Sequence, residues 1–175
     1  MSVATRIAEA GIIAPMSWRP TTPGWIMRAG LIALAFPSAV IAVWGLISPR
    51  GFYDTFPGAG RHWVSALPPY NEHLLRDFSA ASLAIVVFLV GAAIVLERRL
   101  IQVALIALLA YSLPHLAYHL TTTDHYSTGD NFGSLGGFVV TVVIAVGLLA
   151  LTRPASESSG APPPYASSPS PSSRS

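Results

Sequence analysis

The chain has 175 residues, of which 52% are hydrophobic and 10% are charged, whereas a soluble domain carries about 25% charged residues. The net charge of +2 is small and scattered, which argues against nucleic-acid binding. The sequence contains no cysteine, so disulfides, thiol catalysis and cysteine-ligated metal clusters are excluded. This composition indicates a membrane protein.

Residues 1–25 are expected to form a cytoplasmic N-terminal segment. Their short apolar run is broken by Gly11 and Pro15, and it lacks the basic start and long apolar centre of a signal peptide. Four longer apolar stretches follow, each close to the roughly 20 residues that cross about 30 Å of hydrocarbon as a helix. They cover residues 26–47, 78–96, 100–120 and 132–151.

Helices are expected in all four stretches, because lipid offers no partners for unpaired backbone groups. The sequence therefore predicts an all-α fold, an integral membrane four-helix bundle. Glu97-Arg98-Arg99 leaves room only for a tight turn, so spans two and three should form an antiparallel hairpin. Pro37 and Pro114 lie inside spans one and three, where neighbouring helices can satisfy the freed carbonyls.

Arginine positions predict the orientation of the bundle. The connections after spans one and three carry three of the ten arginines, and the other side carries seven. By the positive-inside rule, both termini should be cytoplasmic. Residues 152–175 are mostly Ser, Pro, Ala and Gly, which predicts a disordered C-terminal tail.

The first outer loop, residues 48–77, is too long for a simple turn and is rich in aromatic residues. We expect it to lie at the membrane surface as an interfacial lid held by its aromatic residues, or to have a more specific function. Asn71 is a plausible N-cap near its end, and Glu72 and Arg76 have the favourable i,i+4 spacing of a helical ion pair.

Ionisable residues gather at the predicted outer face. His73 and Asp77 are spaced i,i+4, and so are His115 and His119. Asp77 and His119 each lie 21 residues from Arg98, so an antiparallel hairpin places them at equal depth and predicts a hydrogen bond between them. The whole predicted cluster comprises Glu72, His73, Asp77, His115, His119, Asp124 and His125.

Three uses of this cluster remain open. It could be a structural hydrogen-bond network that braces the loop against the bundle. It could hold a metal ion through His73, Asp77, His115 and His119, or a haem between His73 and His119. It could also line a pocket for a quinone, a lipid or a small solute. The HExxH pattern of metalloproteases is absent.

Three segments carry a resemblance. Residues 51–58, 69–77 and 114–119 resemble a family of small four-span membrane proteins from actinobacteria, which are loosely DoxX-like. The resemblance covers residues 26–150 and implies a four-helix bundle in the plasma membrane. It implies no reaction and no catalytic residue.

Three classes of function therefore compete. The favoured one is a structural or accessory membrane protein with a membrane-protein partner or a second copy of itself. The alternatives are a metal-, haem- or quinone-binding redox protein, and a carrier of a small solute or a lipid. No hydrolase or nucleotide-binding pattern occurs in the sequence, so an enzyme is the less favoured reading.

Overall fold

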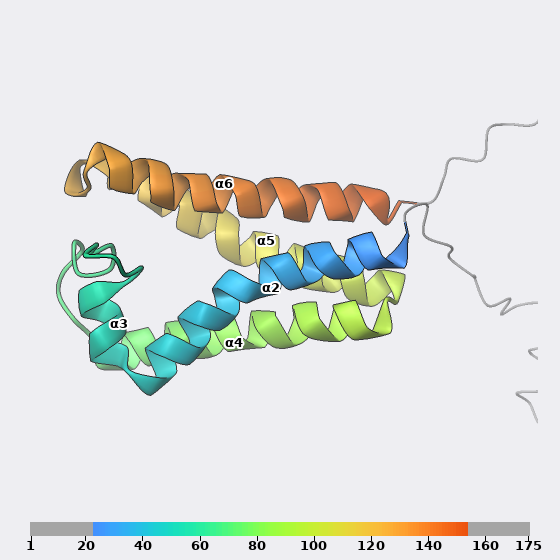
Figure 1. The fold of residues 1–175 in the computed structure, drawn as a ribbon, viewed down its shortest axis with the longest axis horizontal. Coiled ribbons are helices and arrows are strands. Elements are labelled where there is room, and N and C mark those ends of the chain that lie inside the picture. Colours follow the sequence, from blue (N-terminus) through green and yellow to red (C-terminus); the bar gives the residue numbers. More distant parts are fainter. Residues whose placement is uncertain (1–22, 154–175) are drawn as a thin grey trace, which may run out of the picture.

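The computed structural model describes residues 23–153. Within this range the helices are α2 (Gly24–Ile47), α3 (Pro49–Thr55), α4 (Glu72–Val95), α5 (Arg98–Leu120) and α6 (Thr128–Leu151), with a short 3₁₀ turn, η1 (Thr123–His125) (Figure 1). The expectations for residues 1–22 and for the tail 154–175 fall outside the described range.

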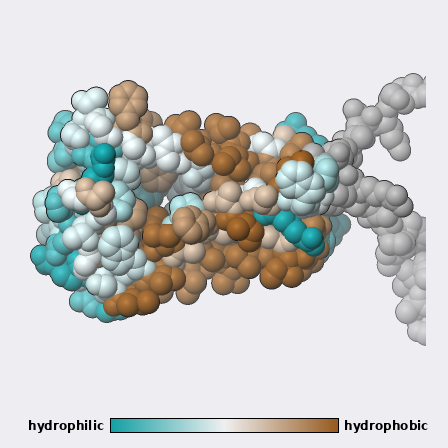
Figure 2. All heavy atoms as spheres, viewed as in Figure 1, coloured by the Kyte–Doolittle hydropathy of each residue, from teal (hydrophilic) through white to brown (hydrophobic). Residues whose placement is uncertain are grey.

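Four of these helices, α2, α4, α5 and α6, are long and apolar enough to cross a membrane. Figure 2 shows hydrophobic residues over the middle of the bundle and hydrophilic ones at its ends. Large apolar side chains point outward within this region, including Phe36 (70% exposed) and Val143 (64% exposed). Lipid is the environment that such a surface requires. The chain is an all-α, multi-pass membrane protein, as its composition predicted.

The two ends of the bundle differ. At one end, here called the hairpin end, Leu96 and Glu97 join α4 to α5; the described range also starts and stops there (Figure 1). Leu96 adopts a left-handed conformation (φ 55°), which ends α4. The opposite end, here called the loop end, carries α3, the connection 56–71 and η1.

Local sequence explains where two helices begin. The Asn71 side chain accepts a hydrogen bond from the backbone N–H of Leu74 (3.0 Å) and caps α4, as predicted. The Ser127 hydroxyl accepts one from the backbone N–H of Asp130 (3.1 Å) and caps α6. Such caps satisfy backbone donors that have no partner inside the helix.

The main hydrophobic core fills the hairpin-end half of the bundle. It draws on the first halves of α2 and α5 and the last halves of α4 and α6, with Leu31, Leu89, Ile101, Leu105 and Ala145 completely buried. Hydrogen bonds reinforce this end: Arg28 Nε donates to the carbonyl of Ala93 (3.1 Å), and Gln102 Nε2 donates to the buried hydroxyl of Thr152 (3.0 Å).

The helices separate toward the loop end. Helix α2 packs along α4, but it touches α6 much less, and Figure 1 shows α2 bending away from α6 in its second half. Pro37 explains the bend, because it has no N–H to donate to Ala33 and its ring crowds the preceding turn. Gly45 then lets α2 approach α4 closely: a Cβ there would lie 2.0 Å from the Ser79 hydroxyl.

The predicted outer loop 48–77 is more ordered than a surface lid. It starts as α3 and ends as the first turns of α4. Its aromatic residues turn inward: Phe52 is only 2% exposed and lies edge-on to Trp44 of α2, with ring centroids 5.8 Å apart. Phe56 bridges Phe52 and Trp63, with centroid distances of 4.6 and 6.1 Å. Aromatic packing therefore fastens the loop to the bundle.

Candidate functional site

A large cavity occupies the loop-end half of the bundle, where the main core is absent. Its volume is about 750 Å³, and it is lined by α2, α3, the connection 56–71, α4, α5, Tyr126 and α6. Most lining residues are apolar, among them Pro37, Ile41, Phe56, Leu75 and Phe138. This volume lies within the roughly 300–1,000 Å³ range of small-molecule pockets.

A strip of polar side chains on α5 faces this apolar cavity. Ser112, His115 and His119 follow one another at helical spacing and all line the cavity. The Nε2 atoms of His115 and His119 lie 3.2 Å apart, so one ring donates a hydrogen and the other accepts it. Phe138 of α6 packs on both rings, with centroid distances of 4.7 and 5.2 Å.

One atom of this strip lacks a partner. Nδ1 of His119 is buried and makes no hydrogen bond among the described residues. An unsatisfied buried polar atom costs about 1–3 kcal/mol. The His119 ring therefore carries unused hydrogen-bonding capacity next to the cavity that it lines.

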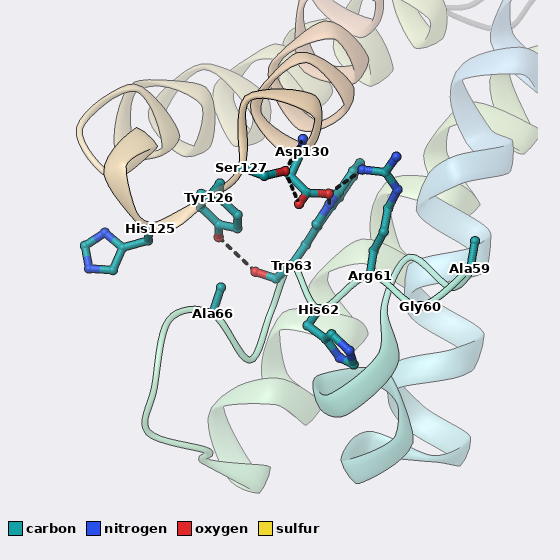
Figure 3. Close-up of a pocket in the computed structure, with 10 residues that line it drawn as sticks. All are labelled: Ala59, Gly60, Arg61, His62, Trp63, Ala66, His125, Tyr126, Ser127 and Asp130. Carbon is teal, nitrogen blue, oxygen red and sulfur yellow. Dashed lines mark hydrogen bonds and ion pairs between the residues drawn. The ribbon is translucent and has the colours of Figure 1, made fainter.

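A second, polar cavity lies beyond the first, at the loop end, and is here called the vestibule. Its volume is about 430 Å³, and its lining includes Arg61, His62, Trp63, Tyr126 and Asp130 (Figure 3). Trp63 and Tyr126 line both cavities. These two side chains, here called the wall, therefore lie where the apolar cavity in the bundle meets the polar cavity at its end.

Asp130, in the first turn of α6, holds this wall in place. One carboxylate oxygen accepts hydrogen bonds from the Trp63 indole Nε1 (2.7 Å) and from Arg61, and the other accepts one from the Ser127 hydroxyl (2.6 Å). Figure 3 shows these groups converging from α6 and from the connection 56–71. A single carboxylate thus ties the loop to α6.

Tyr126 completes the wall by donating its phenol hydrogen to the carbonyl oxygen of Trp63 (2.8 Å). Burial raises the pKa of this phenol above its usual value, so it stays protonated at neutral pH and can donate. Beside the wall, Gly133 leaves room for the indole, because a Cβ there would lie 2.9 Å from a ring carbon of Trp63.

The structure corrects the hydrogen bond predicted between Asp77 and His119. Asp77 instead lies near His73, at 3.4 Å, and the two side chains are 63% and 88% exposed. His119 pairs with His115. The prediction failed because the short turn fixes the depth of each residue but not the direction in which its side chain points. The predicted ion pair of Glu72 and Arg76 is present, at 2.8 Å.

The other members of the predicted cluster are also dispersed. Asp124 and His125 lie 3.6 Å apart and are exposed, and Figure 3 shows His125 directed away from Asp130. Within residues 23–153, no group of three or more His, Cys, Asp or Glu side chains could hold a metal ion. The cluster proposed from the sequence therefore separates into pairs, of which only His115 and His119 line the apolar cavity.

Sequence reasoning did not predict the wall of Trp63 and Tyr126, nor the contacts of Arg61 and Asp130 that hold it. One signal was available: Ser127 and Asp130 match the Ser-x-x-Asp pattern of a helix start. The pairing of Asp130 with a loop 69 residues earlier had no local signature. Comparisons with protein-family models, curated proteins and solved structures found no match. The DoxX-like resemblance therefore stays a prediction.

Proposed function

We propose that this membrane protein binds a lipid-soluble amphiphile, of the lipid or quinone type, in the cavity of its loop-end half. The observation that carries the proposal is the 750 Å³ cavity between helices that pack tightly at the opposite end. The separation of α2 from α6 supports entry from the side. A ligand dissolved in the bilayer could then reach the cavity without passing through water.

Selectivity for such a ligand would come from its head group. Lipid tails are as apolar as the cavity lining, so apolar contact alone does not favour a ligand over a lipid chain. Hydrogen bonds within a bundle contribute about 0.6–2 kcal/mol each. The strip formed by Ser112, His115 and His119 offers such bonds, and Nδ1 of His119 has its capacity unused.

A photoreactive probe tests this proposal. A diazirine-bearing hexadecanol is added to the full chain in lipid nanodiscs, and the crosslinked residues are mapped by mass spectrometry. We expect labels on cavity residues, and loss of these labels in Gly137→Leu. Gly137 lines the cavity and a Cβ there would meet nothing within 4 Å, so leucine at this position should occupy part of the cavity.

Gly147→Leu is the matched control. Gly147 also lies on α6 with open space beside it, but it does not line the cavity. It should keep the labelling of the parent protein. Equal labelling of Gly137→Leu and the parent, or labels confined to the lipid-facing surface, would refute ligand binding in the cavity.

An accessory role is the second candidate, and the exposure of α6 supports it. Within the most apolar 18-residue segment of α6, only 17% of the residues are buried, compared with 28% in the corresponding segment of each other span. A membrane-protein partner or a second copy of the chain would cover this helix. Crosslinking from a cysteine at Val143, on the exposed side of α6, would detect a neighbour, and the absence of any protein adduct in native membranes would refute this role.

We also propose a plasma-membrane location with both termini cytoplasmic, on the basis of the arginine asymmetry. The sequence has no cysteine, so single cysteines can be labelled cleanly. An impermeant thiol reagent should label Asp124→Cys, whose position is 83% exposed, in intact cells and spare Arg98→Cys. The reverse pattern would invert the orientation.

A further inference from the structure

The two cavities meet at the two side chains of the wall. The larger cavity is apolar and lies among the membrane-spanning helices, whereas the vestibule is polar and lies among the connections at the loop end. Trp63 and Tyr126 belong to the lining of both. Displacement of these side chains would join the compartments into a continuous path from the bundle interior to the aqueous face.

The wall is held by contacts that can break one at a time. Trp63 comes from the connection 56–71, and it is fixed by one hydrogen bond to Asp130 and one from Tyr126. The ion pair of Arg61 with Asp130 is partly exposed, at 45% and 23%, so water weakens it. No element of the bundle has to unfold for the indole to move.

We propose that Trp63 and Tyr126 form a gate, through which the polar head group of an amphiphile held in the cavity reaches the vestibule. This inference rests on the proposed ligand binding and adds a direction of transfer. The tail would enter between α2 and α6, and the head group would emerge at the loop end. The protein would then present a membrane-dissolved molecule to the aqueous phase.

The vestibule has the polar lining that a head group requires. Arg61 and His62 lie on its loop side, and Asp130 and Ser127 lie on its α6 side (Figure 3). Nδ1 of His62 already contacts the carbonyl of Asp54, at 2.6 Å. On the other side of the gate, His119 is next to Tyr126, with ring centroids 6.0 Å apart. Hydrogen-bonding groups are thus available on both sides.

Thiol accessibility tests the gate without any knowledge of the ligand. Ser134→Cys places a near-isosteric thiol in the apolar cavity, at a position that is 6% exposed and does not line the vestibule. In nanodiscs, lipid blocks a charged methanethiosulfonate reagent from the side, so a closed gate predicts slow labelling of this thiol. Two control positions set the range of labelling rates. Ala66→Cys in the vestibule should react fast, and Val143→Cys, which faces lipid, should react slowly.

Two independent variants should open the gate. Trp63→Phe removes the indole N–H that binds the Asp130 carboxylate, and Gly133→Ala adds a methyl group 2.9 Å from the indole ring. Loss of one hydrogen bond to a charged group should raise the labelling rate of Ser134→Cys by about tenfold or more. Gly136→Ala is the matched control for Gly133→Ala, since its Cβ would meet nothing within 4 Å.

The gate is supported if Ser134→Cys reacts slowly in the parent and at least about tenfold faster in both opening variants, with Gly136→Ala unchanged. It is overturned if Ser134→Cys reacts as fast as Ala66→Cys in the parent, or if both variants leave its rate unchanged while circular dichroism shows them folded. If the photoreactive probe still labels the cavity in that case, ligand binding stands and exchange occurs only between α2 and α6.

Discussion

The close approach of α2 and α4 leads to a quantitative prediction for Gly45→Ala. A Cβ at this position would lie 2.0 Å from Oγ and 3.1 Å from Cβ of Ser79, which is completely buried. Rotation of the hydroxyl relieves the first contact but breaks its hydrogen bond to the carbonyl of Leu75 (2.8 Å). The second contact remains. The helices must therefore move apart, at a cost of about 1–3 kcal/mol for overpacking.

This cost is measured best against a second glycine-to-alanine change. Alanine is favoured over glycine inside a helix by about 1 kcal/mol, and that gain applies equally at Gly91 of α4, where an added Cβ meets nothing within 4 Å. The difference in free energy of unfolding between Gly45→Ala and Gly91→Ala therefore isolates the packing cost. We expect Gly45→Ala to be the less stable by about 1–3 kcal/mol.

The assay is a titration with sodium dodecyl sulfate in dodecylmaltoside micelles, followed by tryptophan fluorescence. Ser79→Ala removes the nearest atom, so the double variant with Gly45→Ala should recover part of the lost stability, giving a coupling of at least about 0.5 kcal/mol. Equal stability of Gly45→Ala and Gly91→Ala, or strict additivity with Ser79→Ala, would show that this contact does not hold α2 against α4.

Three further predictions concern the exposed pair of His73 and Asp77, the bend of α2 at Pro37 and the gate. His73→Ala and Asp77→Ala should each change the free energy of unfolding by less than about 0.5 kcal/mol. A cost above about 1 kcal/mol in the same titration would mean that the replaced side chain also contacts a third group. Pro37→Ala should straighten α2 and reduce cavity labelling by the diazirine probe several-fold; unchanged labelling would mean that the bend does not shape the cavity. Tyr126→Phe should lower the free energy of unfolding by about 0.5–1.5 kcal/mol and speed the labelling of Ser134→Cys. Burial raises the pKa of the Tyr126 phenol, so the labelling rate of Ser134→Cys without further changes, corrected for thiolate fraction, should stay constant up to about pH 10. A rise in this rate near neutral pH would contradict the prediction.

The sequence predicted the helical membrane fold because span length and polarity are local properties. Each of the four apolar stretches corresponds to one long helix. Helix α4 begins where Asn71 was expected to cap it, since a cap depends on only four consecutive residues. The ion pair of Glu72 with Arg76 was predictable for the same reason.

The candidate site was harder to predict, because a membrane helix is apolar on every side. In a soluble helix the polar face marks the surface, and the periodicity then shows which side is buried. Here lipid-facing residues such as Val143 are as apolar as core residues such as Leu105. The rotation of α4 and α5 could not be read from such a pattern, so the pair of Asp77 with His119 was wrong. The link between Trp63 and Asp130 spans 67 residues and depends entirely on tertiary structure.

The concentration of the core at the hairpin end has a consequence for motion. The bundle consists of two helix pairs, or arms, α2 with α4 and α5 with α6. The buried contacts around Leu31 and Leu105 join the arms at the hairpin end and form a pivot, and the loop ends of the arms are their tips. Backbone amides near the pivot should exchange with deuterium only when the whole bundle opens, and those near the tips should exchange through local separation of the arms. A ligand held between the tips would slow both kinds of exchange, because either opening releases it.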